Sequence, residues 1–497
     1  MATAPSRWVA LATLTAAVLL VAVDNSVLGL AVPFLSRDLA PTADELLWIG
    51  DSYSFVLAGL LVTMGTLGDR IGRKRLLLSG AVAFGVLSVL VAYSRDAGML
   101  IASRALLGVA GATLMPSTLS IIRNLFADPR ERTAAIGLWG AASAAGVAAG
   151  PILGGVLLEH FWWGSVFLIN VPVMVVLVAV GSVTLPESRD PRPGPLDPAS
   201  VGLSLVGVVG AVFAAKRAAV GGGWPTVAAA GLVGVAGLAA FVRRQLRLSV
   251  PLIDVRLFRG SRFGGALLAD LLAVLGLSGV VFFVSQYFQL VRGFRPLLAG
   301  VAELPLTVGA VVGGLVAGPL ARRWGAGPAV GAALGLAALA MTGMLGAGMA
   351  GGYPLVAGAL LLAGCGTSVA FTLTADIMLS SVVKEKAGAA SSVEETGFEL
   401  GAALGIALLG SVITVGYRAG LVLPAGAPEA ARDSLGAAVE EAGRLPPGPG
   451  EMVLRAARQS FVEGMHAGAV ASAVCLAVAA VATLVLLRGD RGQHSES

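Results

Sequence analysis

The chain has 497 residues, of which 56% are hydrophobic and 13% charged. A soluble domain carries about 25% charged residues, so this composition excludes a soluble globular protein and predicts a protein embedded in a lipid bilayer. The net charge of +5 does not indicate a nucleic-acid partner, because Lys and Arg occur mostly in short loops between apolar segments.

Apolar runs of about 20 residues predict fourteen membrane-spanning helices. An even number of spans places both chain termini on the same side of the membrane. In chain order the predicted helices cover residues 8–32, 45–67, 76–94, 98–123, 134–157, 164–185, 199–216, 226–242, 263–288, 298–320, 328–349, 354–378, 392–416 and 464–487.

The loops on the two sides of these helices differ in positive charge. One side carries dense clusters such as Arg70–Arg75 and Arg243–Arg262, whereas the short loops of the other side hold only isolated basic residues. Because cytoplasmic loops are enriched in Lys and Arg, both termini are expected in the cytoplasm. The long segment 418–460 then lies outside, where Pro428–Gly443 and Glu451–Glu463 predict a helical hairpin resting on the outer mouth.

An internal repeat predicts the architecture. The segment Gly65–Gly72 after the second helix is echoed by Gly318–Gly325 after the tenth. Two six-helix halves would place these segments six helices apart, and the observed eight indicates two helices inserted at the centre. The predicted domains are a six-helix bundle over 1–185, linkers and two inserted helices over 186–262, and a second six-helix bundle over 263–497. Parallel halves of this kind suit alternating access.

Several segments resemble the motifs of a known family. The stretch GTLGDRIGRKR at Gly65–Arg75 resembles the cytoplasmic signature of the major facilitator superfamily, and GVAAGPILGG at Gly146–Gly155 resembles its antiporter motif. Arg104–Gly108, Leu46–Asp51, Trp163–Pro172 and Lys386–Gly401 are similar to further motifs of its fourteen-helix drug:proton antiporters. The resemblance covers essentially the whole chain, and it implies an all-α major facilitator fold with two six-helix bundles and two inserted helices.

The signature after the second helix is expected to form a conformational latch, as it does in the superfamily. Its glycines permit a tight corner, and its aspartate can accept hydrogen bonds from cationic side chains and from amides at a helix start. Asp128 is a possible additional partner. The predicted latch residues are Gly65, Gly68, Asp69, Arg70, Gly72 and Arg73.

The antiporter motif places glycines at every fourth position of the fifth helix. Gly146, Gly150 and Gly154 would form one smooth face, with Pro151 able to bend the helix and Gly155 completing the motif. Such a face would let the two halves come together and part.

Acidic residues within apolar helices are candidates for proton coupling, because a charge at bilayer depth is costly and usually functional. Asp24 lies roughly 24 Å along the first helix from Trp8. Asp51 and Arg104 lie at a similar depth from outside, and a buried Arg needs an anionic partner. We therefore predict an outer cluster of Asp24, Asp51 and Arg104, with Asp24 also in contact with cargo, as the resemblance implies.

The thirteenth helix carries three glutamates that the resemblance links to cation recognition. Glu395 and Glu399 share a helical face, whereas Glu394 points about 100° away. Glu399 is expected to lie deepest; an alternative leaves Glu394 and Glu395 solvated near the membrane surface. Asp270 is predicted as a second binding position or an interhelical hydrogen-bond partner. Two further acids near helix ends, Glu303 and Asp376, are expected to be solvated.

The resemblance implies a secondary transporter of a bacterial cytoplasmic membrane that exchanges protons for amphipathic, cationic drugs or dyes. The alternative cargo is a neutral or anionic antibiotic or metabolite. The chain has no G-x-x-x-x-G-K-[ST] phosphate loop for an ATP-driven pump, and its three histidines are scattered, which argues against an enzyme. We expect a monomer with no cofactor and no metal, driven by the proton gradient. The two cysteines, Cys365 and Cys475, are expected to be packing residues.

Overall fold

The computed structural model describes residues 4–487, apart from 40, 42, 190–196, 220–222, 249–250, 350–351 and 425. Fourteen apolar helical segments in this part of the chain are long enough to cross a membrane, which confirms the predicted fold class. The first half contains α1 (Ala4–Leu39), α2 (Ala43–Ile71), α3 (Arg73–Ala92), α4 (Ala97–Leu125), α5 (Pro129–His160), α6 (Ser165–Leu168) and α7 (Asn170–Thr184). Two central helices follow, α8 (Pro198–Ala219) and α9 (Trp224–Gln245). The second half contains α10 (Ser261–Gln286), α11 (Pro296–Trp324), α12 (Ala326–Gly343), α13 (Tyr353–Ser380), α14 (Ala387–Gly420), α15 (Leu435–Arg444) and α16 (Pro447–Leu486).

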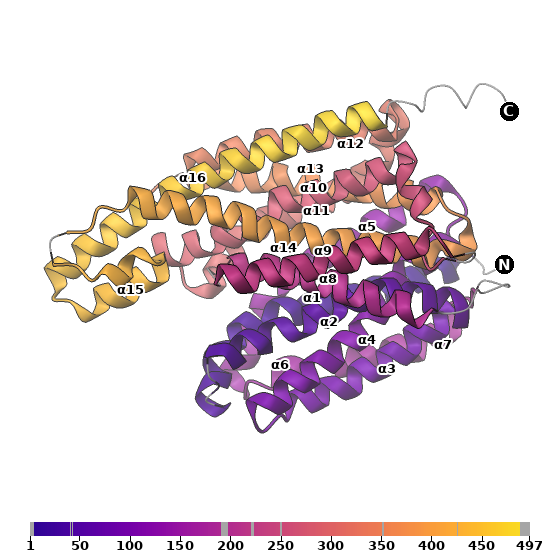
Figure 1. Cartoon of the computed structure of the whole chain (residues 1–497), viewed down its shortest axis with the longest axis horizontal. Coiled ribbons are helices and arrows are strands. Elements are labelled where there is room, and N and C mark those ends of the chain that lie inside the picture. The colour runs from indigo at the N-terminus through magenta and orange to yellow at the C-terminus, as the bar shows by residue number, and fades with distance from the viewer. Residues whose placement is uncertain are drawn as a thin grey trace.

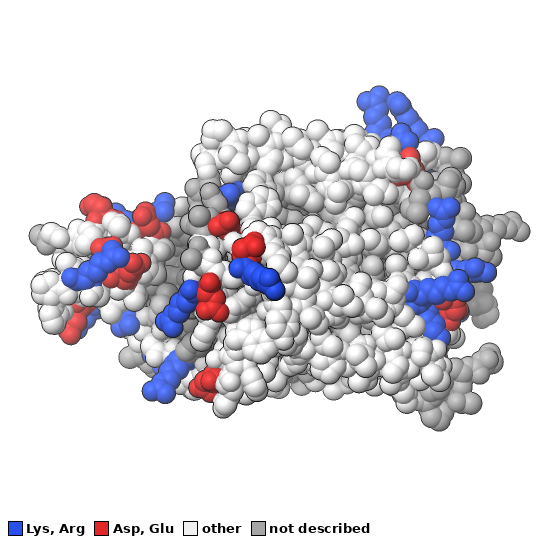
Figure 2. All heavy atoms as spheres, turned by 90° about the horizontal axis from the view of Figure 1, so that it is seen from below, with Lys and Arg blue, Asp and Glu red and all other residues white. Residues whose placement is uncertain are grey.

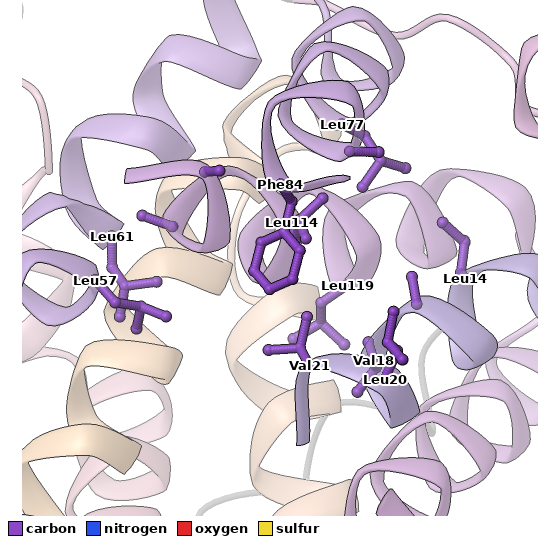
Figure 3. Close-up of a cluster of buried hydrophobic side chains, with 14 of the residues drawn as sticks. Leu14, Val18, Leu20, Val21, Leu57, Leu61, Leu77, Phe84, Leu114 and Leu119 are labelled. Carbon is purple, nitrogen blue, oxygen red and sulfur yellow. The ribbon is translucent and has the colours of Figure 1, made fainter. Parts of the chain in front are cut away.

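The membrane helices form two bundles with two large hydrophobic clusters (Figure 1), and the cluster of the first bundle extends to residues of α10, α13 and α14 in the second. In the first bundle, side chains from α1 to α4 converge, among them Leu14, Leu57, Phe84 and Leu114 (Figure 3). Small residues dominate the second core, where alanines of α12 and α13 allow the helices to approach closely. The sixth predicted helix is divided at Ile169 into α6 and α7, which together make one span.

The inserted helices α8 and α9 stand at the seam between the bundles. The helix α8 packs against both α2 and α14, through a buried cluster that includes Phe55, Val212 and Ala403. The helix α9 packs against α8, where Gly210 and Gly234 let the two backbones approach. Insertion has therefore placed one helix in contact with both halves.

An ion pair joins the two ends of this inserted hairpin. Asp197, just before α8, accepts hydrogen bonds from Arg244 Nε and Nη2 at 2.5 and 2.8 Å and from Ser200 Oγ at 2.5 Å. The hydrogen bonds from Arg244 hold the pKa of the Asp197 carboxyl well below its usual range. The hairpin is thus closed at the end that lies beside the predicted cytoplasmic loops.

The segment 418–460 differs from its prediction. The first side of the hairpin is a short 3₁₀ turn, Glu429–Arg432, followed by α15, but the second side is the beginning of α16 and continues without a break into the last span. Tyr417 at the end of α14 donates a hydrogen bond to the Ala431 carbonyl at 2.7 Å, and Arg458 Nε donates to the Leu290 carbonyl at 2.8 Å. The hairpin therefore extends from the second bundle (Figure 1) instead of resting as a separate helix pair on the mouth.

Charged side chains gather at the two ends of the molecule and leave the middle uncharged on the face shown in Figure 2. The end where α1 begins and α16 ends shows mainly Lys and Arg, whereas the hairpin end shows both signs. The beginning of α1 and the end of α16 therefore lie on the same side of the molecule, as an even number of spans requires. Arg192, Arg488 and Arg491, which contribute to the predicted charge bias, lie outside the described residues.

Candidate functional site

Asp24 is fully buried in α1 and has two polar partners in the first bundle. Its Oδ2 atom lies 3.7 Å from Arg104 Nη1 on α4, and its Oδ1 atom accepts a hydrogen bond from Asn170 Nδ2 at 2.6 Å. Asn170 begins α7 and also donates to Ser88 Oγ at 3.0 Å. Asn170 was absent from the sequence-based prediction, because an isolated amide beside a helix break carries no signal of its own.

Arg104 is held on several sides, as a buried guanidinium requires. Its Nε donates a hydrogen bond to the Ile49 carbonyl at 3.2 Å. The guanidinium also lies 5.1 Å from the ring centroid of Tyr53 and 5.8 Å from that of Phe167, distances that favour cation–π attraction. Asp24 and Arg104 thus form a compensated charge pair inside the first bundle.

Asp51 does not join this pair, so the predicted three-residue cluster is wrong. Its Oδ1 atom instead lies 2.5 Å from Lys216 Nζ on the inserted helix α8. The reason is helical geometry: Tyr53, which faces Arg104, is two residues further on, and two residues correspond to a rotation of about 200°. The prediction was based on depth in the membrane alone and did not include contact with an inserted helix on the opposite face of α2.

The three glutamates of α14 diverge in their surroundings. Glu394 and Glu395 are buried, with exposed fractions of 1% and 5%, whereas Glu399 is half-buried. The alternative in which Glu394 and Glu395 are solvated at the membrane surface is therefore wrong. Both carboxyl oxygens of Glu394 lack a hydrogen-bond partner among the described residues.

Asp270 on α10 is fully buried beside the α14 glutamates. It interacts electrostatically with Glu394 and Glu395, and its Oδ1 accepts a long hydrogen bond, 3.4 Å, from Thr374 Oγ1 on α13. Its Oδ2 atom has no partner within the described part of the chain. Burying carboxyl oxygens without partners is costly, which is typical of a site that exchanges ligands or protons.

Tyr53 links the acidic residues of the two halves. It is buried on α2 with Arg104 over its ring, and Asp24 of the first half and Glu395 and Glu399 of the second lie near enough to repel a negative charge on its hydroxyl group. Its hydroxyl group has no hydrogen-bond partner among the described residues. The charged groups of the two bundles therefore lie within electrostatic range of one shared side chain.

Aromatic rings from three helices continue the site toward α5. Trp139 stacks on Phe371 of α13 with ring centroids 5.8 Å apart, and Phe371 meets the edge of Phe398 at 6.0 Å. The Trp139 indole N–H donates to Thr118 Oγ1 at 3.0 Å, which fixes the orientation of the ring. Phe398 directly precedes Glu399, so one turn of α14 supplies both an aromatic ring and a carboxylate. Phe371 was missed in the sequence, where one Phe in an apolar helix resembles any other.

Asp69 joins the two halves at the end opposite the external hairpin. Its Oδ1 accepts hydrogen bonds from Arg73 Nε and Nη2 at 2.9 and 2.6 Å and from Gly388 N at 2.9 Å. Its Oδ2 accepts from Ala389 N at 3.0 Å. Asp69 thus supplies to α14 the capping oxygen that this helix lacks in its own half.

Arg73 extends the same junction. Its Nη2 also donates to the carbonyls of Lys384 and Glu385 at 2.8 and 2.9 Å, just before α14 begins. Gly72 has a φ of 109°, a conformation that favours glycine, and it makes the corner between α2 and α3. Gly68 accepts the closing hydrogen bond of α2 from Gly72 N at 3.0 Å, whereas none of the described bonds across the junction involves Arg70.

Close packing and further ion pairs surround this junction. Gly65 lies directly against Gly388, where a Cβ on either residue would overlap backbone. Arg132 Nε lies 2.5 Å from Asp376 Oδ1, and Thr133 Oγ1 donates to Asp376 Oδ2 at 2.9 Å, so Asp376 is an inter-half partner and not a solvated acid. Asp128, considered for the latch, instead caps its own helix α5 through Arg130 N.

The antiporter motif contacts a different partner from the one predicted. A Cβ at Gly146, Gly150 or Gly154 would overlap atoms of α1, so the smooth face of α5 packs inside the first bundle. Pro151 lies within α5, and Gly155 faces open space. The close approach between halves on α5 occurs at Gly137, which packs directly against Gly314 of α11.

Comparison with known proteins agrees with this architecture. The family model described as Major Facilitator Superfamily matches residues 14–406. The chain is 44% identical over 489 residues to the Multidrug efflux pump LfrA of Mycolicibacterium smegmatis, covering 97% of each chain. It is 37% identical to the Methyl viologen resistance protein SmvA of Salmonella typhimurium, covering 94% of this chain and 95% of the relative.

A solved structure supports the fold. The crystal structure of the human organic anion transporter MFSD10 aligns with a TM-score of 0.64, covering 96% of this chain and 99% of that one, at 15% identity. The residues that match the family model include the Asp69 junction and helices of both bundles. We conclude that this multi-pass membrane protein belongs to the Major Facilitator Superfamily of transporters.

Proposed function

We propose that the chain is a proton-coupled antiporter that exports amphipathic, cationic drugs, dyes or antiseptics. The observation that carries this proposal is the arrangement of acids around Tyr53, with the Asp24–Arg104 pair in one half and the α14 glutamates in the other. The similarity to a multidrug efflux pump and to a methyl viologen resistance protein supports the same direction of transport and cargo class.

The coupling follows from competition for carboxylates. A cationic cargo binds when Glu395 and Glu399 are ionised, and its flat rings pack against Phe398 and Phe371. When the site opens to the outside, proton binding neutralises the carboxylates and releases the cation. Release of the proton toward the cytoplasm restores the charge, so cargo and proton leave in opposite directions.

The first-half pair supplies the proton-sensing element of this cycle. Arg104 stabilises ionised Asp24. Protonation of Asp24 would remove this attraction and leave the guanidinium held by Ile49 and Tyr53. Because Asn170 bridges Asp24 and Ser88, the change is transmitted to α3 and α7. The Asp69 junction holds one end closed while the other end exchanges ligands.

The proposal includes an orientation and a location. The basic end that carries the Asp69 junction faces the cytoplasm, both termini lie there, and the protein works as a monomer in a bacterial cytoplasmic membrane. Its partners are protons, drug-like cargo and lipid, with no nucleic acid and no cofactor. Residues 1–185 and 263–497 are the moving bundles, and 186–262 holds the inserted pair.

Transport in vesicles tests this function. Inside-out vesicles containing the protein should accumulate ethidium when acidified inside, should stop when a protonophore collapses the gradient, and should not respond to ATP. Addition of ethidium to the purified protein in weak buffer should release protons. ATP dependence, or efflux that is indifferent to the gradient, would contradict antiport.

The same assay separates the cargo classes. A variant with Glu394→Gln, Glu395→Gln and Glu399→Gln should lose ethidium transport while a neutral cargo is still moved, because only the cation needs the carboxylates. Export of a neutral or anionic antibiotic by the wild type, without ethidium transport, would identify the chain as a dedicated metabolite exporter instead.

A further inference from the structure

Lys216 is a charged residue of the inserted helix α8 that lies at the seam between the two halves. Its Nζ atom lies 2.5 Å from Asp51 Oδ1 and 5.2 Å from the ring centroid of Phe55, both on α2. The side chains of Lys216 and Asp51 are 31% and 30% exposed. Lys216 lies in the last turn of α8 and makes this polar contact from within the helix.

The packing of α2 on α14 places this ammonium group near the α14 glutamates. Gly65 packs against Gly388, and Phe55 shares a buried cluster with Ala403, so the two helices run antiparallel. Phe55 lies roughly 15 Å back along α2 from Gly65, and the same rise along α14 reaches the turn that contains Glu399. Lys216 over the Phe55 ring is therefore at the depth of Glu399, and these two groups interact electrostatically.

The inserted helix α8 packs against both halves, but its ion pair and its aromatic contacts are with α2. On α2, Gly59 fits against Leu205 of α8, and Phe213 of α8 packs against Trp48 and Phe55 with ring centroids 6.1 and 5.7 Å away. On α14, α8 contacts an apolar face that includes Ala403 and Ala407 together with Leu400 and Leu404. Because its ion pair and its ring contact are both with α2, Lys216 moves with Asp51, and its separation from Glu399 changes as the halves rock.

We infer that Lys216 determines charge selectivity, acting as a cation tethered to Asp51 beside Glu399 that weakens the binding of cationic cargo to that carboxylate. This inference rests on the proposed antiport of cations, and it assigns the inserted helices a part in that function. A fixed positive charge repels a second cation in proportion to the charge of that cation. Lys216 should therefore disfavour divalent cargo more strongly than monovalent cargo, and leave uncharged cargo unaffected.

Binding measurements on charge-removing variants test the inference. In purified protein at fixed pH, Lys216→Met should bind ethidium about threefold more tightly than the wild type and methyl viologen about tenfold more tightly. Lys216→Arg, which keeps the charge, should bind both as the wild type does. The matched control is Arg217→Met, because Arg217 is the adjacent cation and contacts the Phe213 ring with no described acidic partner.

A double variant identifies the acid that Lys216 shields. In the variant that combines Lys216→Met with Asp51→Asn, Glu399 has lost the neighbouring cation and residue 51 no longer carries a charge. The gain in affinity should therefore persist. Return to wild-type affinity would overturn the assignment to Glu399. Unchanged affinity in Lys216→Met, or an equal gain in Arg217→Met, would overturn the selectivity role altogether.

Two further readouts separate failure of the inference from other failures. Should Lys216→Met not fold, Lys216→Gln removes the same charge and retains hydrogen bonding to Asp51, and it is judged by the same two affinities. If the wild type itself neither binds ethidium nor releases protons on cargo addition, the proposed function fails. If the wild type does both and the variants match it, only the role of Lys216 fails.

Discussion

At the scale of single residues, the site combines one compensated charge pair with acids that lack partners. Asp24 and Arg104 lie 3.7 Å apart with further contacts to Asn170 and Ile49. Glu394 and Asp270 retain buried oxygens without hydrogen bonds in the described structure. Asp24 Oδ2 and Arg104 Nη1 likewise make no hydrogen bond among the described residues, but their charges compensate each other, whereas no described ion pair involves Glu394 or Asp270.

Removing one member of the buried pair should be costly. Asp24→Asn is expected to lower the free energy of unfolding by about 3–5 kcal/mol, because Arg104 stays buried without its anion. Asp51→Asn, on a half-exposed ion pair, should cost about 1 kcal/mol or less. Denaturation of purified protein in detergent measures both.

The double variant Asp24→Asn with Arg104→Met should regain most of this stability, since no unpaired charge remains. Gradient-driven ethidium efflux should stay absent in it if Asp24 couples transport to protons. A single Asp24→Asn variant as stable as the wild type would show that the buried pair does not support the fold. Full efflux by the double variant would remove Asp24 from proton coupling.

At the scale of helices, close approach of backbones decides which elements move together. The motif glycines of α5 pack on α1 within one bundle, whereas Gly137 meets Gly314 across the bundles. The motif therefore makes α1 and α5 a rigid unit that carries Asp24. The inserted α8 packs against both α2 and α14.

Adding one methyl group to the motif tests this packing. Gly146→Ala should destabilise the protein by about 1–3 kcal/mol and reduce efflux, because the new Cβ would overlap the Leu19 carbonyl of α1. Gly155→Ala is the matched control, since a Cβ there meets nothing within 4 Å and only favours the helix. Thermal unfolding and ethidium efflux compare the two variants, and equal behaviour would refute the α1–α5 contact.

At the scale of the whole molecule, the two bundles are held together at the basic end. Asp69 caps α14 across the interface, and Arg132 pairs with Asp376 beside it. These contacts belong to one conformation of an alternating-access cycle, because opening this end must break all of them together.

Breaking the junction should shift the population toward the conformation open at the basic end. Asp69→Ala removes an acceptor from Arg73 and from two α14 amides, and we expect the open population to rise at least about tenfold. Spin labels at Ile71→Cys and Arg323→Cys, after replacement of the native cysteines, would report the distance between bundles.

The control is Asp128→Ala, which removes a helix cap inside one bundle. It should leave the distribution of label distances unchanged while reducing stability by about 1 kcal/mol. Identical distance distributions for Asp69→Ala and the wild type would contradict a role of this junction in closing the transporter.

The amino-acid sequence by itself determined the properties that local chemistry controls. Hydrophobic length defined the fourteen spans, the repeated loop motif indicated two inserted helices, and isolated charges in apolar helices marked Asp24, Arg104 and the α14 glutamates. These signals are readable because each depends on the cost of placing one residue or one segment in lipid.

Only the tertiary structure decided which residues meet. Helical rotation turned Asp51 away from Arg104 and toward Lys216, and the motif glycines faced α1 instead of the opposite bundle. Asn170, Phe371 and Asp376 became partners through contacts between helices far apart in the chain. Depth along a helix follows from counting residues, whereas the neighbour across its face depends on how whole helices pack, which no local pattern specifies.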